Sequence, residues 1–565
     1  MSRTRVFVCE WIALIVGGVS ACAPAQAAWG AHGMVASDHR LASHAGVEIL
    51  QGGGNAVDAA VATAFAVCVV NPSSCGIGGG GFMLLYLAKQ HRAVALDYRE
   101  TAPALASRDM FVRNGAAVPE LSRRGGLAVA VPGEVAGLAA ALQRYGTRPL
   151  AAVLAPAIRF ARDGFAIEGH LATEIAQSAD ALRATPELAR NFLHADGSPL
   201  RAGETLRQPE LARTLQRIAD EGPEVFYRGD LAASIVRSVQ AAGGVLSMTD
   251  LAAYRPRWRR PLSGRHGRDV VIAMPPPSSG GGVLLEILGI LQHDDLGVLG
   301  HDSPTYAHLL AQAMRHAFAD RAQYYGDPDF VPMPLPQLLA PANTATLRAR
   351  ISATHTLEHS AYGSTLTSHH AAAVDHGTSH LSVMDAAGNA VACTTTINTG
   401  FGALVVAADT GIILNNEMDD FSAQPGVPNV YGLIGNEANA VAPHKRPLSS
   451  MTPTIVTRNG VPVLALGGSG GPLIISGAVE VLLNVLDFGM DATAAVAAPR
   501  IHDQWVPPVL AVEPGVPELM RRALARYGYV VKEVPAMAAI QVVRREAGVF
   551  EGAADPRKGG EADGF

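Results

Sequence analysis

The chain has 565 residues, of which 48% are hydrophobic and 17% are charged, with a formal net charge of −6 at pH 7. This length allows one large domain or two ordinary ones, and the apolar content suffices for a packed core, which excludes a largely disordered chain. A weakly acidic chain also lacks the electrostatic footprint of a nucleic-acid-binding protein. The composition therefore predicts a globular protein whose partners are not nucleic acids.

Residues 1–27 have the pattern of an export signal. Arg3 and Arg5 precede an apolar run from Trp11 to Ala21, and Ala25-Gln26-Ala27 offers small residues for cleavage. The apolar run is too short to span a bilayer. Val19-Ser20-Ala21-Cys22 also resembles a bacterial lipobox, in which Cys22 would be lipidated. We expect a periplasmic or secreted protein, attached to a membrane only if Cys22 carries a lipid.

Three cysteines follow the signal: Cys68, Cys75 and Cys393. In an exported protein Cys68 and Cys75 are close enough in sequence to form a disulfide, and the alternative, which we favour, is two buried thiols near a helix end. Histidines gather at irregular spacing in the polar segment 353–377, a pattern more typical of solvated side chains than of a metal site. We therefore predict no metal and no cofactor.

Two helices are expected early in the chain. Ser37 is a candidate N-cap for the first, and Asn55 for a nearly all-apolar second helix from Ala56 to Val70, which should be central and buried. The glycine-rich run Gly76–Gly81 matches G-x-G-x-x-G, but a helix precedes it and a strand follows, the reverse of the order in nucleotide-binding folds. These glycines are expected to permit close backbone packing instead.

The region from 125 to about 330 is mainly helical in pattern and is interpreted as scaffold. Apolar residues recur there at intervals of three and four in four segments, which are Pro149–Asp163, Pro209–Asp220, Asp230–Ala242 and Tyr306–Arg321.

The stretch that follows Gly377 has the alternation of a buried strand. Leu381 and Val383 fall on one face and His380 on the other, and Gly388-Asn389 provides turn chemistry before a second β-branched run. A hairpin is therefore predicted here. A second hairpin is predicted where Asn459-Gly460 separates two apolar runs.

Thr378 stands at the head of the first of these strands, directly after a glycine. If the Gly377–Thr378 bond were cleaved, Thr378 would gain a free α-amine of pKa near 8 beside its own hydroxyl, so that one residue would supply both nucleophile and base. Taken alone, the position also fits a threonine that merely begins a strand.

A second candidate nucleophile lies in Gly467-Gly468-Ser469-Gly470-Gly471, which matches the G-x-S-x-G elbow of α/β-hydrolases. Such an enzyme would use Ser469 with His502, and with Asp487 or Asp491 as the acid. The alternative interpretation makes this turn an oxyanion hole, because backbone N–H groups at a helix N-terminus favour developing negative charge.

Five motifs occur in a fixed order and together closely resemble the γ-glutamyltranspeptidases, a family of N-terminal-nucleophile hydrolases. They are Thr378-Ser379-His380, Thr396-Ile397-Asn398, Asn415-Asn416-Glu417-Met418-Asp419-Asp420-Phe421, Pro447-Leu448-Ser449-Ser450-Met451 and Gly467–Gly471. The resemblance implies an α+β fold, a four-layer αββα sandwich formed by two autoprocessed subunits. A large subunit of residues 28–377 and a small catalytic subunit of 378–565 would form a heterodimer after autocatalytic cleavage at Gly377–Thr378.

The resemblance also implies a role for each site residue. Thr378 would be the nucleophile, Thr396 would orient it, and the backbone N–H groups of Gly470 and Gly471 would form the oxyanion hole. Arg99, Ser449 and Ser450 would bind the donor's α-carboxylate. Asn398, Glu417 and Asp420 would bind its ammonium group, and Tyr431 would cover the bound glutamyl group. Arginine suits a carboxylate because its planar fork donates two parallel charge-assisted bonds.

The implied activity is that of a γ-glutamyltransferase and glutathione hydrolase, which passes the γ-glutamyl group of glutathione or a related compound to water, an amino acid or a dipeptide. The alternatives within the fold are a glutaryl-cephalosporin acylase and a poly-γ-glutamate hydrolase. A glutaryl group lacks the ammonium, so Glu417 and Asp420 favour γ-glutamyl donors, and the loop carrying Tyr431 favours small ones. A catalytically inactive binding protein is a further alternative.

Overall fold

Two seven-stranded sheets form the centre of the molecule in the computed structural model, which describes residues 27–364 and 377–565. The export-signal pattern with Cys22, and three of the histidines of the segment 353–377, lie outside these residues. Within them, no helix combines the length and the apolar character that a bilayer crossing requires.

Both sheets are antiparallel throughout. The first sheet has the order β23 (Glu561–Gly564), β2 (Gly33–Ser37), β12 (Ser379–Asp385), β13 (Ala390–Thr396), β3 (Gly80–Leu87), β4 (Arg92–Tyr98) and β9 (Arg257–Arg259). The second sheet has the order β1 (Ala28–Gly30), β22 (Val549–Ala553), β21 (Ala539–Glu546), β17 (Val461–Ser469), β16 (Thr454–Arg458), β11 (Asp269–Ala273) and β10 (Leu262–His266).

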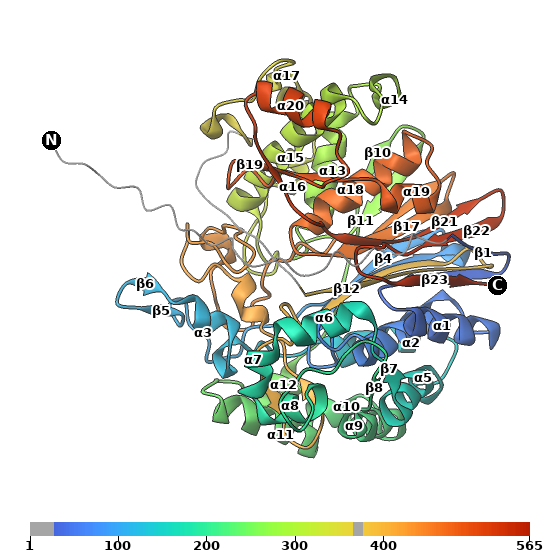
Figure 1. The fold of residues 1–565 in the computed structure, drawn as a ribbon, viewed down its shortest axis with the longest axis vertical. Helices are drawn as coiled ribbons and strands as arrows, with labels where there is room; N and C mark the ends of the chain where they lie inside the picture. The colour runs from blue at the N-terminus through green and yellow to red at the C-terminus, as the bar shows by residue number, and fades with distance from the viewer. Residues whose placement is uncertain (1–26, 365–376) are drawn as a thin grey trace.

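The two sheets pack face to face, and helices cover their outer faces (Figure 1). α1 (Arg40–Gln51), α2 (Ala56–Val70) and α4 (Glu134–Tyr145) contact the first sheet, with α5 (Leu150–Asp163) behind α2. α13 (Gly280–Leu291), α18 (Leu473–Leu486) and α19 (Ala492–Ala497) contact the second, with α15 (Pro304–Tyr324) against α13. The predicted scaffold helices are confirmed as α5, α9 (Pro209–Glu221), α11 (Gly229–Ala241) and α15.

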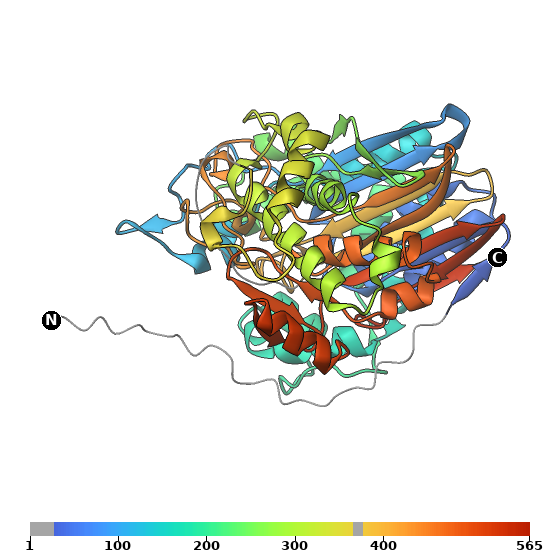
Figure 2. The ribbon, with the colours of Figure 1, turned by 90° about the horizontal axis from the view of Figure 1, so that it is seen from above.

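Segments from before and after Gly377 alternate within the first sheet. β12 pairs with β2 on one side and, through β13, with β3 on the other, while β23 from the chain's end pairs with β2. Figure 2 shows blue strands beside pale orange and red ones in this sheet. Cleavage after Gly377 would therefore leave two pieces held together by sheet hydrogen bonds and a shared core.

Alternation along β12 distributes its side chains between two cores. Leu381 and Val383 join the core beneath α1 and α2, whereas Met384 joins the core between the sheets. The strand is buried on both faces, and the predicted hairpin with β13 is confirmed, as is the hairpin of β16 and β17 around Asn459-Gly460.

Polar caps begin the early helices. The Asn55 side chain accepts from the N–H groups of Val57 and Asp58 and forms a capping box with Asp58, as predicted, and every residue of α2 is buried. The prediction for Ser37 is wrong, because His39 caps α1. Ser37 is the last residue of β2 instead, and its hydroxyl lies 2.8 Å from that of Ser43.

The run Gly76–Gly81 joins α2 to β3 and packs closely against the strand that ends at Thr396. A Cβ at Gly79 would lie 1.9 Å from the Thr396 carbonyl oxygen, and one at Gly81 would lie 2.2 Å from that of Thr394. The predicted packing role is confirmed, and the nucleotide-binding order of elements is absent from this segment.

The structure also distinguishes between the alternatives for Cys68 and Cys75 and for Ser469. Cys68 and Cys75 are free buried thiols. The α/β-hydrolase interpretation of Ser469 is wrong, because β17 lies in an antiparallel sheet and His502 contacts Ser476 and Gln504 instead.

The contact at Gly79 yields a prediction. Gly79→Ala places a methyl group on a backbone oxygen that cannot rotate away, so we expect a destabilisation of about 1–3 kcal/mol and a displaced Thr396. Gly169→Ala is the matched control, because no atom lies within 4 Å of a Cβ there. Thermal unfolding measures both variants, and equal melting temperatures would contradict the packing argument.

Candidate active site

Thr378 immediately precedes β12 and is almost fully buried, with 5% of its surface exposed. The residue before it can only be glycine: Gly377 has a φ of 132°, and a Cβ there would lie 2.2 Å from the Asn398 carbonyl oxygen. This close approach brings the Gly377–Thr378 peptide against the end of β13.

Two threonine hydroxyls meet the Gly377 carbonyl. Thr378 Oγ1 and Thr396 Oγ1 each donate to that oxygen at 2.8 Å and lie 3.2 Å apart. The Asn398 backbone N–H donates to Thr396 Oγ1 at 2.8 Å, which fixes the direction of its proton. The peptide bond before Thr378 is therefore polarised next to a hydroxyl of the same residue.

Lys558 also contacts this threonine, although the sequence did not identify it. Its ammonium donates to the Thr378 carbonyl oxygen and pairs with Asp38 Oδ2 at 2.7 Å. Lys558 lies 180 residues from Thr378 along the chain, so only the packing of β23 beside β2 brings them together.

One small cavity collects nearly all the predicted site residues. Gly470 instead lines a neighbouring cavity that includes Gly377. Met451 and Ile474 add apolar surface that the sequence did not predict. The predicted residues in the first cavity are Arg99, Thr378, Thr396, Asn398, Glu417, Asp420, Tyr431, Ser449, Ser450 and Gly471.

Arg99 follows β4 and is wholly buried, and in this structure it pairs with two carboxylates. Its two Nη atoms donate to Glu417 and Asp420. Its Nε donates to the Pro447 carbonyl at 3.3 Å. Opposite charges thus lie side by side in one desolvated cavity, the arrangement that a zwitterion requires.

Burial controls the protonation of the nearby acids. Burial and the charge of Glu417 raise the pKa of Glu100 well above its usual range, so Glu100 is neutral. Burial also raises the pKa of Asp420 to about 7, while the Arg99 charge opposes the shift. Asp420 therefore titrates near neutral pH.

Glu417 and Asp420 lie on one 3₁₀ turn, Glu417–Asp420, and hydrogen bonds with neighbouring asparagines hold this turn in place. Asn415 Oδ1 accepts from the backbone N–H groups of Glu417, at 3.0 Å, and of Ala130. Asp419, which we assigned no role, accepts from the Val430 N–H at 2.7 Å and so ties the following loop to the turn.

That loop carries Tyr431 over the cavity. The Tyr431 hydroxyl donates to the carbonyl oxygen of Asn398, at 3.1 Å, and lies against its side-chain oxygen. Asn398 has a φ of 78°, uncommon for a residue with a side chain, and its Nδ2 donates to Asn416. Asn398 thus connects the loop, the turn and Thr396.

Ser449 and Ser450 also line the cavity. The Ser279 N–H and hydroxyl both donate to the Ser449 carbonyl, at 2.7 and 2.6 Å. The Ser450 hydroxyl accepts from Arg321 at 3.2 Å. This segment is therefore held from behind by the N-terminus of α13 and by α15.

Gly470 and Gly471 lie between β17 and α18 and have φ angles of 127° and 54°, which favour glycine. Their carbonyls accept from Leu473 and Ile474 in the first turn, so their own N–H groups precede the helix. Gly471 shares the cavity with Thr378, as an oxyanion hole requires.

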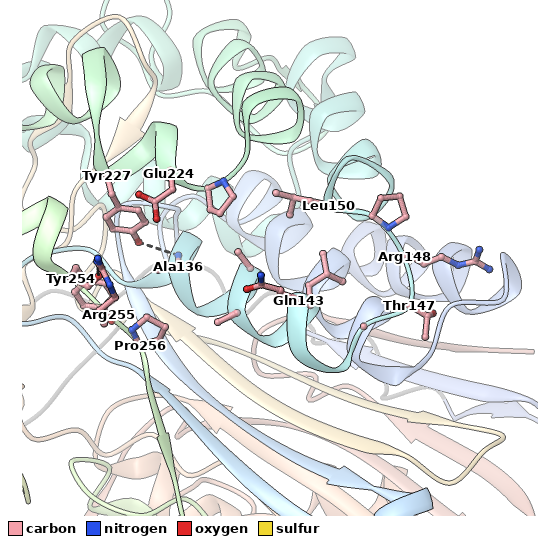
Figure 3. Close-up of a pocket in the computed structure, with 16 residues that line it drawn as sticks. Ala136, Gln143, Thr147, Arg148, Leu150, Glu224, Tyr227, Tyr254, Arg255 and Pro256 are labelled. Atoms are coloured by element: carbon pink, nitrogen blue, oxygen red, sulfur yellow. Dashed lines mark hydrogen bonds between the residues drawn. The ribbon is translucent and has the colours of Figure 1, made fainter.

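A larger cavity lies elsewhere, between α4, α10 (Glu224–Tyr227) and the chain around Tyr254 (Figure 3). None of the predicted site residues lines it. It reaches the active-site cavity only indirectly, since the Tyr254 hydroxyl donates to the Arg99 carbonyl at 2.9 Å. The predicted nucleophile Thr378 and the charged groups converge in the smaller cavity, which is therefore the candidate active site.

A buried threonine hydroxyl against a peptide carbonyl, beside charged and backbone donors, suits an amide-cleaving site with a threonine nucleophile. A family model described as Gamma-glutamyltranspeptidase matches residues 42–565. The chain belongs to the γ-glutamyltranspeptidase family.

Relatives and solved structures agree with this assignment. The chain is 43% identical to the glutathione hydrolase proenzyme of Escherichia coli, covering 93% of this chain and 90% of that protein, and 38% identical to that of Bacillus subtilis, covering 95% and 92%. It resembles a cephalosporin acylase from Bacillus halodurans with a TM-score of 0.86 at 31% identity, covering 98% and 99% of the two chains. It resembles the Helicobacter pylori γ-glutamyltranspeptidase with a TM-score of 0.57 at 38% identity, covering 59% of this chain and 96% of that one.

The pKa of Asp420 gives a prediction for donor binding. Only the carboxylate form attracts an ammonium, and with a pKa of about 7 this form is lost as the pH falls, so we expect the KM for a γ-glutamyl donor to rise between pH 8 and pH 6. The rise approaches about tenfold per pH unit well below the pKa. Steady-state kinetics across this range measures it.

Asp420→Asn removes the titration, so its KM should be high and flat with pH. Asp180→Asn, at an exposed acid on α7 (Ala179–Arg183), is the matched control and should behave as the unmodified protein. A KM that is constant from pH 6 to pH 8 in the unmodified protein would contradict this role for Asp420.

Proposed function

We propose that this protein is an exported γ-glutamyltransferase and glutathione hydrolase that matures by cleaving its own chain at Gly377–Thr378. The observation that carries the proposal is the pair of hydroxyls, Thr378 Oγ1 and Thr396 Oγ1, each 2.8 Å from the Gly377 carbonyl oxygen. They lie at one end of a cavity whose other residues suit a γ-glutamyl group.

In maturation, Thr378 Oγ1 attacks the Gly377 carbonyl carbon while Thr396 holds the carbonyl oxygen. The C–N bond breaks, an ester bond forms, and the hydroxyl proton passes to the departing nitrogen, which becomes the α-amine of Thr378. Water then hydrolyses the ester and leaves a Gly377 carboxylate. Lys558 holds the Thr378 carbonyl, which keeps the new N-terminus in position.

In turnover, the donor's amino-acid head enters among Arg99, Glu417 and Asp420 and replaces contacts that these residues make with each other. Its α-carboxylate binds Arg99, Ser449 and Ser450, and its ammonium binds the two acids and Asn398. Because the head is a zwitterion, each buried charge exchanges one opposite partner for another, which limits the desolvation cost.

The chemical step resembles maturation. Thr378 Oγ1 attacks the γ-carbonyl, the α-amine takes the hydroxyl proton and passes it to the leaving amine, and a γ-glutamyl ester forms. The N–H groups of Gly470 and Gly471 stabilise the oxyanion, at about 3–4 kcal/mol for each well-placed donor. Water or the amine of an amino acid or dipeptide then resolves the ester. No metal or cofactor takes part in this scheme.

The mature protein would contain a large subunit, 28–377, and a small subunit, 378–565, interleaved in a four-layer αββα sandwich. The alternation of segments from both parts in the first sheet supports a heterodimer that stays together after cleavage. The pattern in residues 1–27 supports export to the periplasm or beyond, with Cys22 as a candidate lipid site.

The alternative is a glutaryl-cephalosporin acylase or a poly-γ-glutamate hydrolase, and the likeness to a cephalosporin acylase favours the first of these. A glutaryl group would leave Glu417 and Asp420 without an ammonium partner, and the loop carrying Tyr431 restricts the cavity to small donors. γ-Glutamyl donors therefore fit these residues better.

Thr378→Ala tests the nucleophile. Without the hydroxyl neither cleavage nor turnover can occur, so we expect a single chain of full mature length and loss of γ-glutamyl transfer. Thr173→Ala, on the exposed face of α6 (Gly169–Gln177), is the matched control and should give two chains and normal rates. Two normal subunits from Thr378→Ala, seen on a denaturing gel, would remove the self-cleavage proposal.

Donor choice tests the function itself. We expect kcat/KM for γ-glutamyl-p-nitroanilide to exceed that for glutaryl-p-nitroanilide by tenfold or more, since two buried acids lose their partner in the second, at about 1.4 kcal/mol per factor of ten. Release of p-nitroaniline follows both reactions. A preference for the glutaryl compound would support the acylase alternative.

A further inference from the structure

Arg321, on α15, is a buried cation that forms no ion pair with any residue in the described ranges 27–364 and 377–565. Five arginines are buried in the part of the chain that the structure describes, and four of them pair with a carboxylate: Arg99 with Glu417 and Asp420, Arg315 with Asp503, Arg446 with Asp97 and Arg500 with Asp555. Arg321, only 4% exposed, is bonded to serine hydroxyls instead. A buried charge with no counter-ion is costly and calls for an explanation.

The two serine contacts lead directly to the cavity. Arg321 Nη2 donates to Ser450 Oγ at 3.2 Å, and its Nε donates to Ser279 Oγ at 2.8 Å. The Ser279 hydroxyl in turn donates to the Ser449 carbonyl at 2.6 Å. Arg321 thus holds both serines of the proposed carboxylate subsite, although it does not itself line the cavity.

The direction of these bonds determines what Ser450 can do. A guanidinium has only donors, so Ser450 Oγ is the acceptor in this contact and its own proton remains available for an acceptor in the cavity. Behind that proton lies a full positive charge. The arrangement favours a negatively charged acceptor over a neutral one.

The electrostatics around Arg321 also favour a negatively charged ligand. Burial lowers the pKa of Arg321 to about 10, and the more distant charge of Asp420 opposes this only in part. The residue remains protonated at neutral pH. A carboxylate placed against Ser449 and Ser450 would supply the negative charge that this side of the cavity lacks.

We propose that Arg321 is a positioning residue that makes the site select donors with an α-carboxylate, by orienting the Ser450 hydroxyl and by placing an unpaired positive charge behind it. This inference rests on the proposed function and adds a second cation to the subsite, beyond Arg99. Arg99 reaches the cavity directly and is already shared between two acids, whereas Arg321 acts only through the serines.

The test compares two donors that differ only in the carboxylate. γ-Glutamyl-p-nitroanilide and 4-aminobutyryl-p-nitroanilide share the amide and the ammonium, and the second has hydrogen in place of the carboxylate. In Arg321→Met, kcat/KM for the γ-glutamyl donor should fall roughly 10- to 100-fold, as expected for a lost charge-assisted contact, mainly through KM. The 4-aminobutyryl donor should change by less than about threefold. Arg321→Lys should restore part of the preference because it keeps the charge.

Controls separate this role from a structural one. Self-cleavage at Gly377–Thr378 involves no α-carboxylate, so Arg321→Met should still give two chains. Arg217→Met, at a partly exposed arginine on α9 that lines no part of the cavity, is the matched control and should change the rate with neither donor. If Arg321→Met is not cleaved, Arg321→Lys tests the proposal in its place. The single ammonium of lysine cannot reproduce both serine contacts, so the KM for the γ-glutamyl donor should still rise in this variant.

Equal losses on both donors, or an unchanged γ-glutamyl KM in either Arg321 variant, would overturn the proposal. Results with the unmodified protein test the proposed function separately from the role of Arg321. If the unmodified protein released p-nitroaniline from neither donor, or preferred the glutaryl compound, the γ-glutamyl assignment would fail before Arg321 came into question.

Discussion

The proposed function depends on one contact, in which the Gly377 carbonyl oxygen accepts from the hydroxyls of Thr378 and Thr396. It exists because Gly377 adopts a conformation open to glycine and approaches the Asn398 carbonyl more closely than any side chain would allow. The close packing of Gly79 against Thr396, and the pairing of β12 with β13, keep both threonines in register. In the proposed function, the sheets and their helices hold the Gly377–Thr378 peptide bond beside the Thr378 hydroxyl.

Charge balance is the second constraint on the site. Arg99 lies between Glu417 and Asp420 with almost no solvent, so a ligand that enters must satisfy both signs. A zwitterionic amino-acid head does this, and a simple dicarboxylate does not. The neutral form of Glu100 prevents a further negative charge from accumulating there, and Arg321 adds positive charge on the side of the serines.

The sequence predicted those parts of the structure that depend on local chemistry. The Asn55 cap, the turns at Gly388-Asn389 and Asn459-Gly460, and the alternation along β12 each require only neighbouring residues, and each is found. The prediction that Ser37 caps a helix was wrong because Ser37 pairs with Leu381 as the last residue of β2. Short polar motifs also identified the residues around the cavity.

Residues that act through distant contacts could not be predicted in this way. Lys558 reaches Thr378 across 180 residues, and Arg321 reaches Ser450 across 129, so neither has a signature in its own segment. Arg321 lies in α15, which the sequence analysis interpreted as scaffold, because its apolar spacing does not indicate that charged residues on this helix are buried. The pairing of Arg99 with Glu417 and Asp420 likewise depends on contact between two segments that are more than 300 residues apart in the chain.

The most direct test of the proposed nucleophile is a denaturing mass spectrum of the purified protein, with the N-terminus of the smaller fragment sequenced. We predict two chains, the smaller one beginning Thr378-Ser379-His380 and ending at Phe565. A single uncleaved chain, or a fragment that begins at any other residue, would contradict the central claim that Thr378 becomes an N-terminal nucleophile.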